Sequence, residues 1–163
     1  MKTASATVRL ADKKDIDRII EIERSWVHLS HWSVDAYRRL LTDENFTTSL
    51  VAETASLGQG RPEAASKIVG FVIFHATNLS SEIYNIAVER GHARLGVGTA
   101  LMNSVVKLSR DNGSRKLMLE VRKSNSSAIG FYTDFRFRIA GERLHYYSGP
   151  VEDAYVMEKD LRL

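Results

Sequence analysis

A strand, a pair of glycines, a helix and a second strand follow one another between residues 82 and 122. The apolar run IYNIAV (83–88) leads to RLGVGTAL (94–101), and KLMLEVR (116–122) alternates as a strand does. Two strands joined through a helix need a crossover connection, which makes them parallel or nearly so. This unit therefore predicts an α/β fold whose sheet contains at least one parallel pair.

The crossover helix has clear boundary signals. It is expected from Thr99 to about Asp111, with Gly113 as its stop and with a core-facing stripe formed by Leu101, Met102, Val105 and Leu108. The flanking segments supply the other elements of a single mixed sheet covered by helices. Strands are predicted at 6–11, 48–53, 67–75, 137–147 and 153–161, and helices after Asp12, after Ser33 and within 124–135. The small, polar segment 54–66 predicts a mobile hairpin loop.

Composition limits the possible functions. The chain has 163 residues, which is enough to form one sizeable core. It contains no cysteine, so disulfides, cysteine nucleophiles and thiolate zinc sites are excluded. No apolar run approaches the ~20 residues of a membrane helix, and the first residues lack the apolar core of a signal peptide. We therefore expect a single domain over residues 1–163, cytoplasmic and without a membrane partner.

Charge and histidine spacing argue against two further classes. The net charge of +3 is spread along the chain, without a run of five or six basic residues, so no nucleic-acid partner is expected. The five histidines show no metal-ligand spacing, so no metal is expected either. A serine nucleophile lacks its usual G-x-S-x-G context.

The glycine segment GVGTAL (96–101) matches neither of the two common phosphate-binding motifs. No Gly-Lys-Ser/Thr follows it, and Leu101 stands where a dinucleotide fingerprint has its third glycine. A strand, Gly-x-Gly and a helix start still bring free amides together, which suits a phosphate group. A plain tight turn explains the same local pattern, so both interpretations stay open here.

Glu120 lies in the middle of the apolar strand that follows the crossover helix. Such strands are usually buried on both faces, where a carboxylate is costly unless it is used or hydrated. Burial would raise its pKa toward the range that suits a general base. The alternative is a solvated face on which Glu120 pairs with Arg122 or Lys123.

The segment SNSSAIGFY (124–132) offers two more candidates. Asn125 either caps a short helix or contacts a ligand. Tyr132 follows seven residues later, two helical turns on, so both side chains can face one cleft. Tyr132 either donates a proton to a leaving group or packs beside Phe131 and Phe135 in the core.

These features occur together, in this order, in one known family. The segments YNIAVERGHARLGVGTALM, LMLEVRKSNSSAIGFY and HYYSGPVEDAYVM resemble the ribosomal-protein alanine N-acetyltransferases of the GNAT superfamily. IIEIERSWVHLSHWSVDAY is similar to the N-terminal helix pair of that family, so the resemblance spans nearly the whole chain. It implies one GNAT domain with about seven strands in a mixed sheet and about four helices, which transfers the acetyl group of acetyl-CoA.

The resemblance also implies roles for individual residues. Glu120 would be the proton acceptor and Tyr132 the proton donor, while Asn125 would contact the cofactor. The pantetheine arm of acetyl-CoA would run along the backbone of Ile86, Ala87 and Val88. The pyrophosphate would be held mainly by main-chain amides of the loop formed by Arg94, Leu95, Gly96, Val97, Gly98 and Thr99.

The implied chemistry is direct transfer without a covalent enzyme intermediate, with the oxyanion held by a backbone amide of residues 86–88. An α-amine with a pKa of ~7.7–8.0 is easier to deprotonate than a lysine at ~10.4, which favours a protein N-terminus. A ribosomal protein with an Ala or Ser start is the leading acceptor, and the enzyme is expected to be a monomer or weak dimer. The alternatives are acetylation of a small-molecule amine and a non-catalytic CoA-binding module.

Three positions depart from the pattern of the superfamily. Ala93 stands where the loop usually has Gln or Arg, Arg90 replaces a common proline, and Arg136 replaces the glycine after the short helix. A non-glycine residue in a left-handed conformation costs ~1 kcal/mol or more, so we expect the turn at Arg136 to be built differently. None of the three affects Glu120 or Tyr132.

Overall fold

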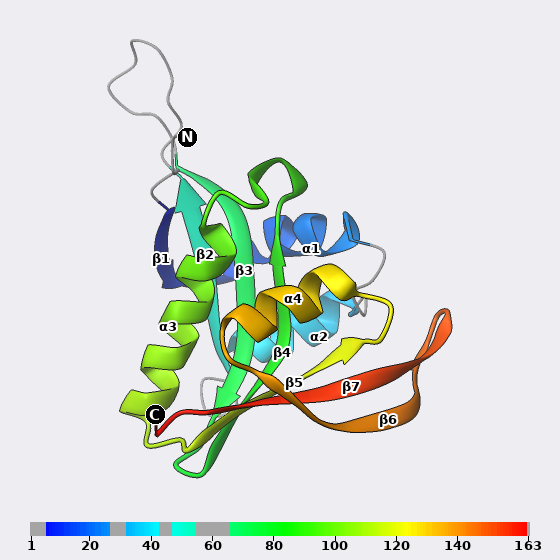
Figure 1. Ribbon diagram of the computed structural model, residues 1–163. Helices are drawn as coiled ribbons and strands as arrows, with labels where there is room; N and C mark the ends of the chain where they lie inside the picture. Colours follow the sequence, from blue (N-terminus) through cyan, green and yellow to red (C-terminus); the bar gives the residue numbers. More distant parts are fainter. Residues whose placement is uncertain (1–5, 27–31, 43–46, 55–65, 163) are drawn as a thin grey trace. The chain divides into compact units, whose positions relative to one another are not determined.

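The computed structural model describes residues 6–26, 32–42, 47–54 and 66–162 (Figure 1). Its strands are β1 (Ala6–Leu10), β2 (Thr48–Thr54), β3 (Lys67–Ala76), β4 (Ser80–Val88), β5 (Lys116–Arg122), β6 (Arg138–Ser148) and β7 (Val151–Asp160). Its α-helices are α1 (Ile16–Arg24), α2 (Val34–Thr42), α3 (Val97–Asp111) and α4 (Ser126–Asp134), with 3-10 turns at Lys13–Asp15 and Arg90–His92. The predicted order of strands and helices is confirmed.

All seven strands belong to one sheet in the order β1-β2-β3-β4-β5-β7-β6. β4 and β5 run parallel, as the crossover through α3 requires. The pairs β1–β2, β2–β3, β5–β7 and β6–β7 are antiparallel. The prediction of a mixed sheet with a parallel pair is therefore confirmed.

The chain forms two compact units that share the continuous elements β3, β4 and α3. Unit 1 comprises residues 1–74 and 85–105, and unit 2 comprises residues 75–84 and 106–163. In the described part of the chain, no helix is long and apolar enough to cross a membrane.

Unit 1 has a core on each face of β3. Phe71 and Ile73 pack against the buried isoleucines of α1 and against Tyr37 of α2. On the other face of β3, Gly70 lies under the first turns of α3, and Figure 1 shows α1 and α2 behind this strand and α3 in front of it.

Capping residues explain where α1 and α2 begin. Asp12 and Asp15 form a capping box before α1, and the Ser33 hydroxyl accepts a hydrogen bond from the Ala36 amide, at the start of α2, at 3.1 Å.

Unit 2 is built around β5. Its odd-numbered residues Leu117, Leu119 and Val121 are buried, as the alternation predicted, while Met118 and Glu120 are partly exposed on the other face. Phe137, Met157 and Leu161 are also buried in this unit. The expectation of burial on both faces of β5 is therefore only half right.

Helix α3 ends at Asp111 as predicted but differs from the prediction at its start and in its buried stripe. It begins at Val97, two residues before Thr99, because the left-handed Gly96 (φ 88°) immediately precedes it. Leu108, expected in the buried stripe, is 37% exposed, and Ser109 is buried instead because it lies four residues after Val105. Gly113 does end the helix, with φ at 85°.

One expectation from the sequence, the loop character of residues 55–65, lies outside the described residues. The expectation for Arg136 is wrong: the turn after α4 keeps its left-handed geometry, with Arg136 at φ 64°.

Candidate functional site

The loop between β4 and α3 has the backbone geometry of an anion site. Arg94 and Gly96 adopt positive φ angles of 62° and 88°, and the helix starts at the next residue. The Ala100 amide donates the first hydrogen bond of the helix, to the Gly96 carbonyl at 2.9 Å. The amides of residues 97–99 precede that bond and have no partner within the helix, so they suit an anionic group.

Gly70 on β3 supports this loop from below. A Cβ at this position would lie 3.0 Å from Val97 Cγ1, 3.1 Å from the Ala87 carbonyl oxygen and 3.1 Å from Leu101 Cδ1. Only a glycine lets the strand segment 86–88 and the first turn of α3 approach β3 this closely. Sequence analysis missed Gly70, because an isolated glycine in a strand does not reveal what packs above it.

The predicted pantetheine segment is the last part of β4. Ala87 is buried, while Ile86 and Val88 are partly exposed. The Val88 carbonyl accepts a hydrogen bond from the indole Nε1 of Trp26 at 2.8 Å, and the next amide, that of Glu89, bonds to Val69 at 2.7 Å. Trp26, two residues after the end of α1, therefore fixes the end of the segment, a contact that no local sequence pattern indicates.

Glu89 anchors the start of the loop. It forms ion pairs with Arg18 of α1 and Lys67 of β3. Burial alone would raise the pKa of Glu89, but the hydrogen bonds from Lys67 and Arg18 outweigh it and lower the pKa to about 2. Arg90, which departs from the family pattern, donates to the Ser25 carbonyl at 2.9 Å and stacks on Trp26 at 4.8 Å.

A buried polar cluster connects β4 to the two N-terminal helices. Tyr37 donates a hydrogen bond to Glu23, and the Asn85 side-chain amide donates to Glu23 Oε1 at 3.0 Å and to Tyr37 Oη at 3.1 Å. All three side chains are buried. Burial, followed by the interaction with Glu23, raises the pKa of Tyr37 far above its usual value. The cluster joins α1 and α2 to β4 one residue before Ile86.

In unit 2, Glu120 projects from the partly exposed face of β5. Its side chain is 11% exposed, and Arg143 Nε of β6 donates to its Oε1 at 2.9 Å. The alternative pairing with Arg122 or Lys123 is wrong, because Arg122 binds Glu152 while Lys123 binds Glu142 and Asp153. Glu120 is therefore a largely buried carboxylate with one cationic partner from a distant part of the sequence.

A second glutamate belongs to the same cluster. Glu82 of β4 is partly buried, and burial, followed by the charge of Glu120, raises its pKa. Sequence analysis missed both Glu82 and Arg143. The alternation of β4 could have placed Glu82 on the exposed face, whereas nothing local indicates that Arg143 reaches Glu120.

The two candidates on α4 have defined structural roles. Asn125 is the N-cap, since its side-chain oxygen accepts a hydrogen bond from the Ala128 amide at 3.2 Å. Tyr132 is buried, and its ring lies 5.6 Å from that of Phe131 and 5.7 Å from that of Phe137. Burial, followed by Tyr147, raises the pKa of Tyr132. The capping role of Asn125 is confirmed, and so is the packing of Tyr132 beside Phe131, whereas the other ring beside Tyr132 is that of Phe137 instead of Phe135. The cofactor contact and the proton donation stay predictions.

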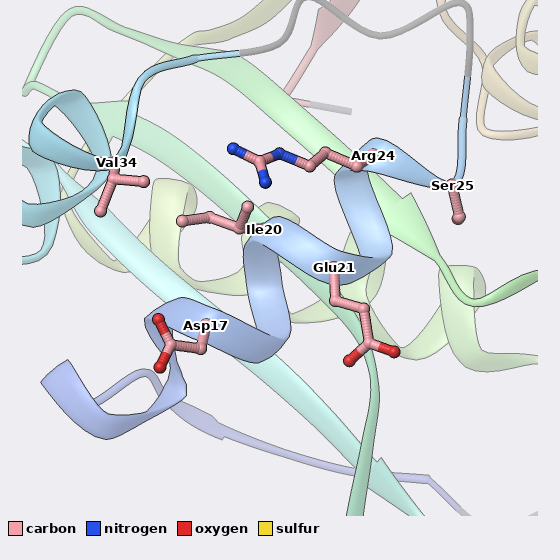
Figure 2. Close-up of a pocket in the computed structure, with 6 residues that line it drawn as sticks. All are labelled: Asp17, Ile20, Glu21, Arg24, Ser25 and Val34. Carbon is pink, nitrogen blue, oxygen red and sulfur yellow. The ribbon is translucent and has the colours of Figure 1, made fainter.

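A surface hollow lies along α1 and the start of α2 (Figure 2). It is lined by Asp17, Ile20, Glu21, Arg24, Ser25 and Val34. Figure 2 shows the Arg24 guanidinium extended over Ile20, with the carboxylates of Asp17 and Glu21 pointing away from each other.

No group of histidine, aspartate and glutamate side chains that could hold a metal occurs among the described residues.

Comparison with known proteins gives a consistent result. Residues 14–137 match the model of the acetyltransferase (GNAT) family. A Bacillus subtilis protein named as a candidate ribosomal protein bS18-alanine N-acetyltransferase is 32% identical over 157 residues, which cover 96% of each chain. An N-alpha-acetyltransferase of Sulfolobus acidocaldarius is 31% identical over 94% of this chain and 92% of its own.

A solved structure agrees with these relatives. The ribosomal-protein-S18-alanine N-acetyltransferase from Escherichia coli superposes with a TM-score of 0.78 at 25% identity, covering 96% of this chain and 94% of that one. The similarity thus extends over both compact units.

Proposed function

The chain belongs to the GNAT acetyltransferase family, and from this premise we propose that it acetylates the N-terminal α-amine of a protein. As a member of the family, it is an enzyme that takes its acetyl group from acetyl-CoA. The leading acceptor is a ribosomal protein that begins with Ala or Ser.

One observation supports this acceptor class above the others. Two relatives that match almost end to end are named for an alanine nitrogen of ribosomal protein bS18 and for α-amino acetylation. An α-amine also needs the weakest base, since its pKa is ~7.7–8.0 against ~10.4 for lysine.

The start of α3 is our proposed seat for the pyrophosphate of acetyl-CoA. Left-handed Gly96 turns the chain into the helix, and the amides of Val97, Gly98 and Thr99 are the donors at that end. Arg94 and Leu95 complete the proposed loop, Ile86, Ala87 and Val88 would contact the pantetheine arm, and Asn125 the cofactor. The close packing at Gly70 supports this assignment, since it fixes the helix start against the strand segment.

In the proposed reaction, Glu120 accepts a proton from the acceptor amine, directly or through a water. The amine nitrogen then bonds to the thioester carbon, whose oxyanion is held by a backbone amide of residues 86–88. Tyr132 protonates the departing thiolate, a role that its protonated, buried phenol supports.

The decisive experiment offers acetyl-CoA together with a panel of peptides that differ at their first residues, alongside polyamines and free amino acids. Transfer to peptides that start with Ala or Ser is the expected result. Transfer to small amines alone would replace the proposal by the small-molecule alternative. Binding of CoA without transfer to any amine would favour the non-catalytic module.

The variant Glu120→Gln tests the proposed base. We expect it to bind acetyl-CoA as the wild type does and to lose turnover by about 10²- to 10⁴-fold, the usual contribution of a general base. Glu142→Gln is the matched control, because Glu142 pairs with Lys123 and is not part of the proposed site. An unchanged rate for Glu120→Gln would show that another group takes the proton.

A further inference from the structure

Glu82 and Glu120 lie on the same face of two parallel neighbouring strands. In the register, Glu82 stands beside Met118, and Glu120 is two residues further along β5 on the face that Met118 occupies. Parallel strands are about 4.8 Å apart, so two glutamate side chains at this offset can reach each other. A hydrogen bond to Glu120 also contributes to the raised pKa of Glu82. We call these two residues the carboxyl pair.

Arg143 reaches the carboxyl pair from two strands away. It stands opposite Ala154 of β7, which in turn stands opposite Arg122 of β5. Both Ala154 and Gly141, the residue of β6 two positions before Arg143, are small and share this face, which leaves room for the guanidinium to cross β7. Irregular pairing of β6 on both sides of Arg143 adjusts where the side chain points.

Several titratable side chains also act on the carboxyl pair. The titratable and charged groups that interact with it come from β3, β4 and β6: His75, Tyr84, Arg143, Tyr146 and Tyr147. Burial, followed by the carboxylate charges, raises the pKa of Tyr84, and the same two causes contribute for Tyr146. The tyrosines therefore remain neutral, and Arg143 is the permanent cation of the cluster.

Two carboxylates within reach of each other repel when both are ionised, and a proton shared between them removes the repulsion. Such a pair binds one proton more tightly than an isolated glutamate does. We propose that Glu82 is a second catalytic carboxyl group, which holds the proton taken from the acceptor amine jointly with Glu120, and that Arg143 is a positioning residue for the pair. This inference rests on the proposed role of Glu120 as the base.

The step is balanced as follows. The acceptor ammonium loses one proton, which the ionised pair binds between its two carboxylates. The free amine nitrogen forms a bond to the thioester carbon, the C–S bond breaks, and the sulfur leaves with its electron pair. Tyr132 gives its phenol proton to the thiolate, the second proton of the nitrogen restores the Tyr132 phenol, and the pair returns its own proton to solvent, so one proton is released per transfer.

Two substitutions should shift the acidic limb of the pH profile of kcat/KM in opposite directions. Glu82→Gln leaves one carboxylate, which cannot share a proton with a second, so the limb moves by about one unit to lower pH, with a lower kcat. Arg143→Gln removes a positive neighbour, so the limb moves to higher pH. A merely structural role would lower activity without moving the limb in opposite directions.

Glu142→Gln is again the control, since Glu142 precedes Arg143 but lies on the other face of β6. The acidic limb of the pH profile of this variant should stay where it is in the wild type. Where a variant turns over too slowly, the carboxyl ¹³C resonance of Glu120 is titrated instead, with the same shifts expected. If wild type, Glu82→Gln and Arg143→Gln show the same position of the acidic limb and the same titration of the resonance, the two carboxyls do not act as a pair. A wild type that acetylates no amine would overturn the proposed function itself, and the ¹³C titration would still decide whether the two carboxyls are coupled.

Discussion

Gly70 is the single residue whose replacement we expect to disturb both folding and cofactor binding. In Gly70→Ala the new methyl group meets Ala87, Val97 and Leu101 at 3.0–3.1 Å, and one of these contacts is a backbone oxygen that cannot rotate away. We expect a loss of about 1–3 kcal/mol in the free energy of unfolding, the usual cost of overpacking, together with weaker acetyl-CoA binding. Urea denaturation and calorimetric titration measure the two effects.

The control for this substitution is Gly130→Ala. Gly130 lies inside α4, and a Cβ added there would meet nothing within 4 Å, so alanine should leave stability unchanged or raise it by up to ~1 kcal/mol. Equal effects of the two substitutions would mean that crowding at Gly70 is not the cause.

Arg136 is strained by its backbone rather than by its contacts. It follows α4 at φ 64°, and the Phe137 amide bonds to the Tyr132 carbonyl at 3.0 Å while the Arg136 amide bonds to Thr133 at 2.8 Å, which is the Schellman pattern. Arg136→Gly should therefore raise the free energy of unfolding by about 1 kcal/mol. Arg136→Ala, which keeps a Cβ, should give no such gain. Equal stability of the two variants in urea would refute backbone strain.

At the level of elements, Glu89 joins α1, β3 and the end of β4 through Arg18 and Lys67. Its pKa is lowered from 4.5 to about 2 in the folded protein, so folding is favoured by its ionised form. The contribution is fully present above the unfolded value near 4.5 and is lost as the pH falls toward 2. The stability difference between wild type and Glu89→Gln should therefore shrink from pH 6 to pH 2.

Urea midpoints at a series of pH values measure this difference. Glu21→Gln is the matched control, because Glu21 also pairs with Arg18 but is largely exposed, and a surface pair contributes little. A difference between wild type and Glu89→Gln that stays constant across the pH range would contradict the linkage.

The sequence predicted the elements well because strands and helices depend on neighbours two to four residues apart. Alternation placed Leu117, Leu119 and Val121 in the core, and Gly113 ended α3 as expected. The ion pair of Glu120 could not be predicted this way, since it depends on β7 lying between β5 and β6 and on two irregularities in β6. The same holds for Gly70 and Trp26, whose partners belong to other elements.

At the level of the whole molecule, each of the two compact units contains only part of β4 and α3. Residues 80–83 of β4 pair with β5 and belong to unit 2, whereas residues 85–88 and the start of α3 belong to unit 1. If one unit unfolded alone, the other would lose the continuation of its own strand and helix. The single domain proposed for residues 1–163 should accordingly unfold in one cooperative transition, with equal calorimetric and van't Hoff enthalpies.

The binding of acetyl-CoA and the substitution Gly70→Ala give two further tests of the single cooperative transition. The proposed pyrophosphate loop and Gly70 both belong to unit 1, so independent units would respond separately to a ligand or a substitution there. A cooperative domain responds as a whole: acetyl-CoA at 100 times its Kd should stabilise it by about 2.7 kcal/mol and move the entire transition upward. Gly70→Ala should move the entire transition downward. Differential scanning calorimetry that resolves two peaks, of which only one moves, would establish two domains instead of one.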